Sequence, residues 1–181
     1  MGDTEAVNNY YVDEAGDLTL FDKRGRVIVG QEGVSRMFMV GVAHLPDPEM
    51  AHHKLGGLRA ALLSDAYFKG VPSMQLNAGK TALYFHAKDD LPEIRREIFK
   101  ILPELGAKVQ VAIRRKETLV NMAQALYRRG EKIRFDDFYD DLVKRLFKRL
   151  LHKADKNAIV FARRGKSVRL HALEGAIDRA K

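Results

Sequence analysis

The 181-residue chain contains no cysteine. Disulfide bonds, thiolate nucleophiles and thiolate zinc sites are therefore excluded, and this absence agrees with a reducing compartment. No stretch approaches the roughly 18 consecutive apolar residues of a membrane span. The first five residues are acidic where a secretory signal would be basic and then apolar. We therefore expect a cytoplasmic protein that has no membrane partner.

Several catalytic signatures are missing as well. Gly79-Lys80-Thr81 and Gly165-Lys166-Ser167 resemble the end of a phosphate-binding loop, G-x-x-x-x-G-K-[ST]. The first glycine of that motif is replaced by Met74 and Val160 respectively, so neither segment is a nucleotide loop of this kind. The chain also has no H-E-x-x-H zinc motif and no G-x-S-x-G nucleophile motif.

The charge is distributed unevenly along the chain. The net charge is +8, but residues 1–87 hold 8 Lys and Arg against 10 Asp and Glu, whereas residues 88–181 hold 24 against 14. A basic half of this kind favours polyanion binding, because each neutralised phosphate releases condensed counterions. Length and composition otherwise fit one soluble domain spanning residues 1–181.

The apolar periodicity predicts an α/β fold with a mixed sheet, in which three N-terminal strands are followed by alternating helices and strands. The expected strands are a first one through Tyr10–Val12, then Arg26–Gly30, the central Met37–Ala43, a short candidate at Ala82–His86, Lys108–Ile113 and Ala158–Ala162. The expected helices are Pro48–Ser64 with Asp47 as its N-cap, about 90–105 capped by Asp89 or Asp90, 117–129, 135–152 and one from Ser167.

The most informative segment is Tyr11-Val12-Asp13-Glu14-Ala15-Gly16-Asp17. Carboxylates are disfavoured inside strands, so acids at a strand end followed by a glycine can direct oxygen ligands at Mg²⁺ or Mn²⁺. We take Asp13 and Glu14 as candidate catalytic residues and Asp13 and Asp17 as candidate metal ligands. A solvated strand-to-turn junction is the alternative, because Asp and Gly are common turn residues.

A second set of candidates is basic and would contact nucleic acid. Arg163-Arg164-Gly165-Lys166 follows an expected strand and precedes an expected helix, where cations and free backbone donors can meet a phosphate. A plain basic turn remains the alternative. The full candidate set is Lys116, Lys148, Arg149, Arg163, Arg164 and Lys166.

Two further groups of polar residues have mainly structural interpretations. Acids fill the first half of the 135–152 helix and bases its second half, an order that the helix dipole and i,i+4 pairing both favour. His86, with Asp89, lies at a candidate strand end before a helix. For His86 we weigh catalysis against a capping or core role.

Two separated motifs resemble the domain of unknown function 3800 family. One is Asp13-Glu14-Ala15-Gly16-Asp17, where members typically have D-E-S-G-D, and the other is Phe85–Arg95, which is similar to F-H-x-x-x-D-x-P-E-V-R. Ala15 replaces the usual Ser, and Ile94 replaces a usual Val. The resemblance implies a ribonuclease H-like fold in which Asp13 matches the first-strand ligand of two Mg²⁺ or Mn²⁺ ions that promote phosphodiester hydrolysis.

The end of the chain departs from the family pattern. Members continue into a late L-Q-x-A-D segment, whereas this sequence ends at Ala176–Lys181 without that acid. We therefore expect a shortened member, one half of a split gene, or a binding protein that has lost catalysis. The leading hypothesis is a metal-dependent protein that processes DNA or RNA. The alternative is a non-catalytic module for nucleic acid, a protein partner or a second copy.

Overall fold

The computed structural model describes residues 7–78, 83–153, 156–162, 174–175 and 177–178. The described chain forms two compact units. One unit, Met1–His44 with Val109–Lys181, contains the sheet, and the other, Leu45–Lys108, is mainly helical. We call them the sheet unit and the helical unit. The helical unit is an insertion in the sequence of the sheet unit.

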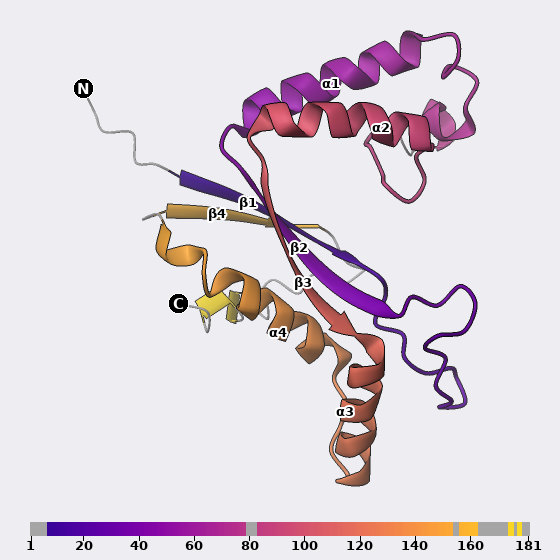
Figure 1. Cartoon of the computed structure of the whole chain (residues 1–181), viewed down its shortest axis with the longest axis vertical. Helices are drawn as coiled ribbons and strands as arrows, with labels where there is room; N and C mark the ends of the chain where they lie inside the picture. The colour runs from indigo at the N-terminus through magenta and orange to yellow at the C-terminus, as the bar shows by residue number, and fades with distance from the viewer. Residues whose placement is uncertain (1–6, 79–82, 154–155, 163–173, 176, 179–181) are drawn as a thin grey trace. The chain divides into compact units, whose positions relative to one another are not determined.

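The sheet has four strands in the order β3-β2-β1-β4 (Figure 1). The strands are β1 (Val7–Ala15), β2 (Met37–Leu45), β3 (Lys108–Arg115) and β4 (Lys156–Phe161). The expected interior position of the apolar Met37–Ala43 segment is confirmed, because β2 lies between two other strands.

The relative directions of the strands follow from their contacts. β1 and β4 are parallel, from Val7 opposite Lys156 to Val12 opposite Phe161. β1 and β2 are antiparallel, since Asn8 at the start of β1 contacts His44 at the end of β2. The sheet is therefore mixed, which confirms the predicted α/β class. Two described strands, and not the expected three, precede the first helix.

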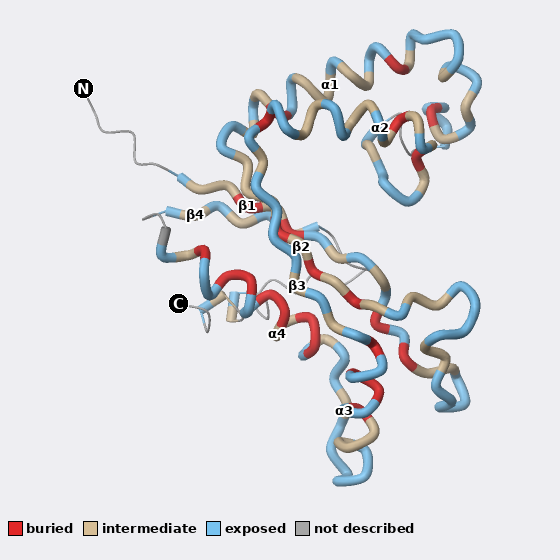
Figure 2. The backbone as a smooth tube through the Cα atoms, in the orientation of Figure 1, coloured by how far each residue is buried: buried red, intermediate tan, exposed pale blue. Residues whose placement is uncertain are grey.

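One face of the sheet packs against α3 (Lys116–Arg128) and α4 (Phe135–Phe147). Figure 2 shows the buried positions following the strands and α4. Because side chains alternate along a strand, each strand contributes every second residue to this core. The largest fully buried apolar side chains of the sheet unit are Leu20, Phe38, Leu119, Leu142 and Phe147.

The apolar residues of β3 lie on the other face. Val109, Val111 and Ile113 are 65%, 50% and 57% exposed, while Ala112 between them packs against the core. Their alternation correctly predicted the strand. The apolar positions nevertheless face outward, which alternation alone does not reveal.

The predicted strand Arg26–Gly30 is wrong. Asp22 accepts hydrogen bonds from the backbone N–H groups of Arg24 and Arg26 and pairs with the Arg26 side chain, which closes a tight loop. Only an isolated bridge between Phe21 and Val27 remains of the strand pairing there. Local bonds from an Asp side chain therefore replace a sheet ladder.

Other boundaries differ by a few residues. The helix expected to reach His152 ends at Phe147 and is followed by the 3₁₀ turn η4 (Leu151–Lys153).

The short candidate strand Ala82–His86 is not observed. Leu83–His86 form no strand, and Ala82 lies outside the described residues. The expected helix from Ser167 also begins outside them, although residues 174–175 and 177–178 are helical.

The helical unit is built on α1 (Pro48–Ser64) and α2 (Pro92–Ile101). The predicted N-cap of α1 is confirmed, since the Asp47 side chain accepts from the Met50 N–H at 2.8 Å. Three 3₁₀ turns, η1 (Pro72–Met74), η2 (Leu76–Ala78) and η3 (Leu102–Leu105), complete the unit. Its small core is formed by Leu62, Met74 and Ile94.

Gly16 is the glycine whose replacement should disturb the sheet most. Its φ is +73°, and a Cβ placed there would lie 2.3 Å from the Met37 carbonyl oxygen, whereas Gly25 at φ +76° has nothing within 4 Å. We expect Gly25→Ala to cost about 1 kcal/mol of unfolding free energy. Gly16→Ala should cost about 1–3 kcal/mol more, because backbone must move. Urea unfolding of the two variants compares them, and equal losses would contradict this explanation.

Candidate functional site

The acidic turn after β1 presents its carboxylates in different surroundings. Asp13 is exposed, and its Oδ1 accepts the N–H of Glu14 at 2.8 Å. Its side chain lies on the opposite side of the strand from Tyr10 and Val12, which are buried in the core. Glu14 alternates back toward the core side and is partly buried. Asp13 is therefore the more accessible of the two candidate catalytic residues.

Asp17 contacts the positive charge of a buried lysine. Its Oδ1 accepts from the Thr19 N–H at 2.6 Å and lies 3.4 Å from the Nζ of Lys116. The Lys116 side chain is completely buried at the start of α3, and its Nζ also lies 3.5 Å from the Thr19 carbonyl oxygen. This contact joins the acidic turn to α3 across 99 residues of sequence.

The surroundings of Asp17 favour its ionised form. Desolvation by burial is the largest single influence and acts to raise the pKa of Asp17. The hydrogen bonds from Thr19 and the nearby Lys116 ammonium outweigh it together, so the pKa is lowered. Lys116, which we expected on a nucleic-acid-binding surface, is instead an internal partner of Asp17. A phosphate cannot reach its ammonium group without displacing that carboxylate.

Strand pairing places the end of β4 close to the acidic turn. β1 and β4 are parallel, so their carboxyl ends lie at the same edge of the sheet. The N–H of Ala162 donates to the Val12 carbonyl at 2.8 Å, directly beside Asp13. The next residue in the sequence is Arg163, the first of the cations Arg163, Arg164 and Lys166. These three lie outside the described residues.

Lys148 and Arg149 belong to the other end of β4. Both are exposed just after α4, in the connection that leads into the start of β4. β4 has six residues, which extends roughly 17 Å at about 3.3 Å per residue. Lys148 and Arg149 are therefore separated from the acidic turn by about the length of a strand.

The acids of α4 have the structural role that we favoured. Asp141 pairs with Arg145 one turn later at 3.1 Å and with Arg114 of β3 at 2.5 Å. Asp137 pairs with Arg134 at 3.7 Å. A pocket of about 240 Å³ lies among the acids and Lys144. The contribution of Arg114 could not be recognised from spacing, because it lies on another element.

The second family-like motif forms a closed turn before α2. The buried Asp90 accepts from the His86 N–H at 2.8 Å, and its own N–H donates to the His86 carbonyl at 2.9 Å. The exposed His86 ring lies 3.5 Å from Asp89, while Arg95 donates to the Ala87 carbonyl at 2.8 Å. The expected capping of α2 by an acidic side chain is wrong, since its N-cap is Leu91 without a side-chain bond. These contacts favour a structural role for the motif.

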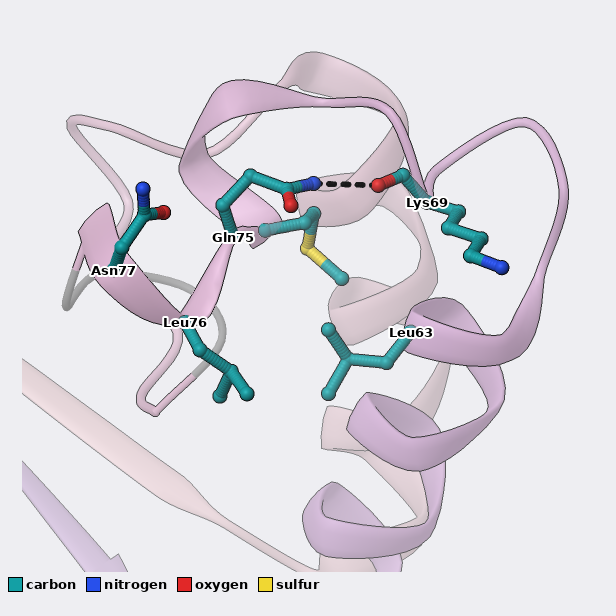
Figure 3. Close-up of a pocket in the computed structure, with 6 residues that line it drawn as sticks. Leu63, Lys69, Gln75, Leu76 and Asn77 are labelled. Atoms are coloured by element: carbon teal, nitrogen blue, oxygen red, sulfur yellow. Dashed lines mark hydrogen bonds between the residues drawn. The ribbon is translucent and has the colours of Figure 1, made fainter.

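A pocket with a volume of about 530 Å³ lies in the helical unit (Figure 3). Leu63, Met74 and Leu76 line its apolar side, and Gln75 spans one edge by donating to the Lys69 carbonyl. None of our candidate catalytic, metal or nucleic-acid residues lines it. The pocket therefore gives no support to the strand-end site.

The acidic turn provides one carboxylate, that of Asp13, that is exposed and not held next to a lysine. Among the described residues, no group of three or more His, Asp or Glu side chains is placed to hold a metal ion. Asp13 can offer an oxygen to one hydrated ion, since Mg²⁺ is commonly bound by one or two carboxylates and keeps several waters. Asp17 fits this role less well, because one of its oxygens already accepts from Thr19 and lies near the Lys116 ammonium.

Comparisons of the chain with protein-family models, curated proteins and solved structures found no match in any of the three. The resemblance to the domain of unknown function 3800 family therefore stays a prediction that rests on its two motifs. Within the described part of the chain, no helix has the length and apolar character needed to cross a membrane.

The contact between Asp17 and Lys116 predicts unequal effects of removing either partner. Asp17→Asn leaves an ammonium group buried without its counter-charge and should cost about 3 kcal/mol of unfolding free energy. Lys116→Met fills the same interior space, while Asp17 is 61% exposed and stays solvated. This variant should cost less than about 1 kcal/mol. Urea unfolding at pH 7 measures both, and a larger loss in Lys116→Met would contradict the explanation.

The same contact predicts that the stability of Asp17→Asn and that of the parent protein depend differently on pH in acid. Because folding lowers the pKa of Asp17, its stabilising contribution is present above the ordinary Asp pKa of about 3.9 and is lost as pH falls through the lower folded value. Asp17→Asn should therefore show a smaller loss of stability than the parent protein on acidification below about pH 4. Parallel pH profiles would contradict the proposed linkage.

The turn before α2 gives a matched pair of variants. Asp90→Ala removes the acceptor of the His86 N–H from a position that is 4% exposed, and we expect a loss of about 1–3 kcal/mol. His86→Ala removes an exposed ring but keeps that backbone donor, so its effect should stay within about 0.5 kcal/mol. Urea unfolding compares the two, and a larger effect of His86→Ala would argue for a more important side chain.

Proposed function

We propose that the chain is a ribonuclease H-like nucleic-acid-binding protein in which Asp13 holds a divalent ion next to bound phosphate. The principal supporting observation is the parallel pairing of β1 with β4. This pairing places Ala162, and thus the point where the sequence Arg163-Arg164-Gly165-Lys166 begins, beside Asp13. The sequence that holds these cations therefore begins at the end of the sheet where Asp13 lies.

The sheet arrangement supports the ribonuclease H-like part of this proposal. The resemblance implies a carboxylate on the first strand of a mixed sheet. β1, β2 and β3 follow one another across the sheet, and β1 lies inside it with Asp13 near its end. This position gives the Asp13 carboxylate a rigid backbone, which a catalytic or metal-binding group needs.

The chemistry expected of such a site depends on the ion and on the substrate together. A bound divalent cation would activate water and stabilise the leaving oxygen of a phosphodiester. Asp13 would supply a protein oxygen, and substrate phosphates would complete the ligand set, as is usual for Mg²⁺. Lys116 contacts Asp17, four residues after Asp13, and so joins the acidic turn to α3.

A non-catalytic binding module is the second candidate. It is favoured by the contacts of Asp17, which accepts from Thr19 and lies next to Lys116 and is therefore a poor second ligand. Two-metal hydrolysis requires several carboxylates. On this interpretation the acidic turn stabilises the sheet edge and the basic half alone provides nucleic-acid binding.

A binding experiment with Asp13→Asn tests the proposal. Mn²⁺ should bind the parent protein with roughly millimolar affinity, detected by electron paramagnetic resonance, because one carboxylate and waters form the site. Asp13→Asn should abolish this binding without changing the melting curve. Arg163→Ala with Arg164→Ala should leave Mn²⁺ binding unchanged but weaken association with a labelled oligonucleotide at about 50 mM salt, measured by fluorescence anisotropy.

The outcomes separate the two candidates. Mg²⁺-dependent cleavage that disappears in Asp13→Asn would establish the enzyme. Oligonucleotide binding without cleavage, and without Mn²⁺ binding at Asp13, would support the non-catalytic binding module. No oligonucleotide binding by the parent protein at this salt concentration would reject both.

A further inference from the structure

The far end of α3 displays a tyrosine that folding does not bury. Tyr127 is 78% exposed, which is the highest value among the large hydrophobic side chains of the described residues. The buried residues of α3 are Lys116, Leu119, Val120 and Ala123, all in the first part of the helix. Figure 2 shows exposed and intermediate residues over the final part. The last turn of α3 therefore extends beyond the core.

The end of α3 is nevertheless well ordered. Gly130 has a φ of +72° and donates its N–H to the Tyr127 carbonyl at 3.0 Å, while Glu131 donates to the Leu126 carbonyl at 3.0 Å. This pair of bonds is a Schellman motif, which closes the helix and fixes the direction of the following chain. Ile133 then packs against the main core. The motif and this contact hold the exposed end as a defined structure, which we call the α3 tip (residues 127–134).

The α3 tip is strongly basic. It holds the cations Arg128, Arg129, Lys132 and Arg134 against one acid, Glu131. Arg129 pairs with Glu131 at 3.2 Å, and Arg134 lies 3.7 Å from Asp137 of α4. Within the described part of the chain, Arg128 and Lys132 have no ion-pair partner, and both are exposed. Two exposed cations within five residues of the exposed Tyr127 are thus available to a ligand.

The α3 tip is also connected to the strand-end site. α3 begins at Lys116, whose ammonium group lies 3.4 Å from Asp17. Tyr127 follows eleven residues later, which corresponds to roughly 16 Å along a helix that rises about 1.5 Å per residue. Tyr127 therefore lies roughly 16 Å along α3 from the lysine that contacts the acidic turn.

We propose that the α3 tip binds unpaired nucleotides, with the ring of Tyr127 stacked on a base and Arg128 and Lys132 bound to flanking phosphates. Cationic side chains combined with an exposed aromatic ring are the usual means of binding single strands, because every base has a face that can stack. Duplex bases are already stacked and offer no such face. This inference rests on the proposed function and adds a preference for single-stranded or locally opened substrate.

The composition of the tip favours nucleic acid over other polyanionic partners. A membrane-bound helix needs a broad apolar face, whereas the tip offers one tyrosine among cations. An acidic protein would gain from the charges but has no need of a stacking surface. The membrane alternative gives a distinct result in the experiment below.

The test measures the affinity of the full chain for a fluorescein-labelled oligo(dT) of 20 nucleotides and for a duplex of the same length, by anisotropy. Tyr127→Ala should weaken oligo(dT) binding roughly 5- to 100-fold and change duplex binding much less, because one stacked base is lost. Tyr127→Phe should retain the affinity. Lys132→Ala should lower the slope of log affinity against log salt by about 0.7, since one phosphate contact is lost.

Tyr84→Ala is the matched control, because Tyr84 is 76% exposed and belongs to the helical unit. It should leave oligo(dT) binding unchanged, and melting curves should show all variants folded. If the parent protein binds oligo(dT) but Tyr127→Ala binds equally well, the inference is overturned while the proposed function stands. If the parent protein binds neither oligonucleotide, both fail. Tyrosine-dependent binding only to phosphatidylserine vesicles would also overturn the inference.

Discussion

The register between β1 and β4 is the constraint on which the rest of the sheet unit depends. Six successive residue pairs and the bond from the Ala162 N–H to the Val12 carbonyl hold the two strands side by side over their whole common length. A slip of one residue would turn Tyr10 and Val12 out of the core, since side chains alternate between faces. The burial of these two residues therefore fixes which residue lies beside Asp13. Packing in the core and the placement of the candidate site are determined by the same register.

Burial of Lys116 is the least expected feature of this arrangement. A positive charge at the first position of a helix opposes the helix dipole, and its desolvation costs several kcal/mol before any pairing is counted. The contacts with Asp17 and the Thr19 carbonyl offset part of this cost. An apolar residue would fill the same volume without this desolvation cost. Stability alone therefore gives little reason for a lysine here. A reason is provided by its contact with Asp17, which joins the acidic turn to α3.

Local patterns predicted the elements that local interactions determine. Alternation and apolar content identified Met37–Ala43 as an interior strand, and capping preference identified Asp47. The prediction of a strand at Arg26–Gly30 was wrong because hydrogen bonds to the Asp22 side chain form a loop, which competes with strand pairing. The interior position of Lys116 depends on contacts across 99 and 97 residues, which no window of sequence contains. The acids of the candidate site were thus found from sequence, but not their partners.

The position of Asp13 helps to distinguish binding alone from metal-dependent chemistry. Its carboxylate is exposed, it is not part of the core, and its neighbouring strand leads into a basic sequence. A phosphate about 4 Å from an unpaired carboxylate is repelled by about 1 kcal/mol in water, and by more where solvent is partly excluded. A module that only binds nucleic acid would therefore bind more tightly with a neutral residue at this position. A divalent ion reverses the sign of this interaction, because it attracts both the carboxylate and the phosphate. An acid at this edge weakens simple binding and becomes favourable when a metal ion takes part, which is why we rank the metal-dependent candidate first.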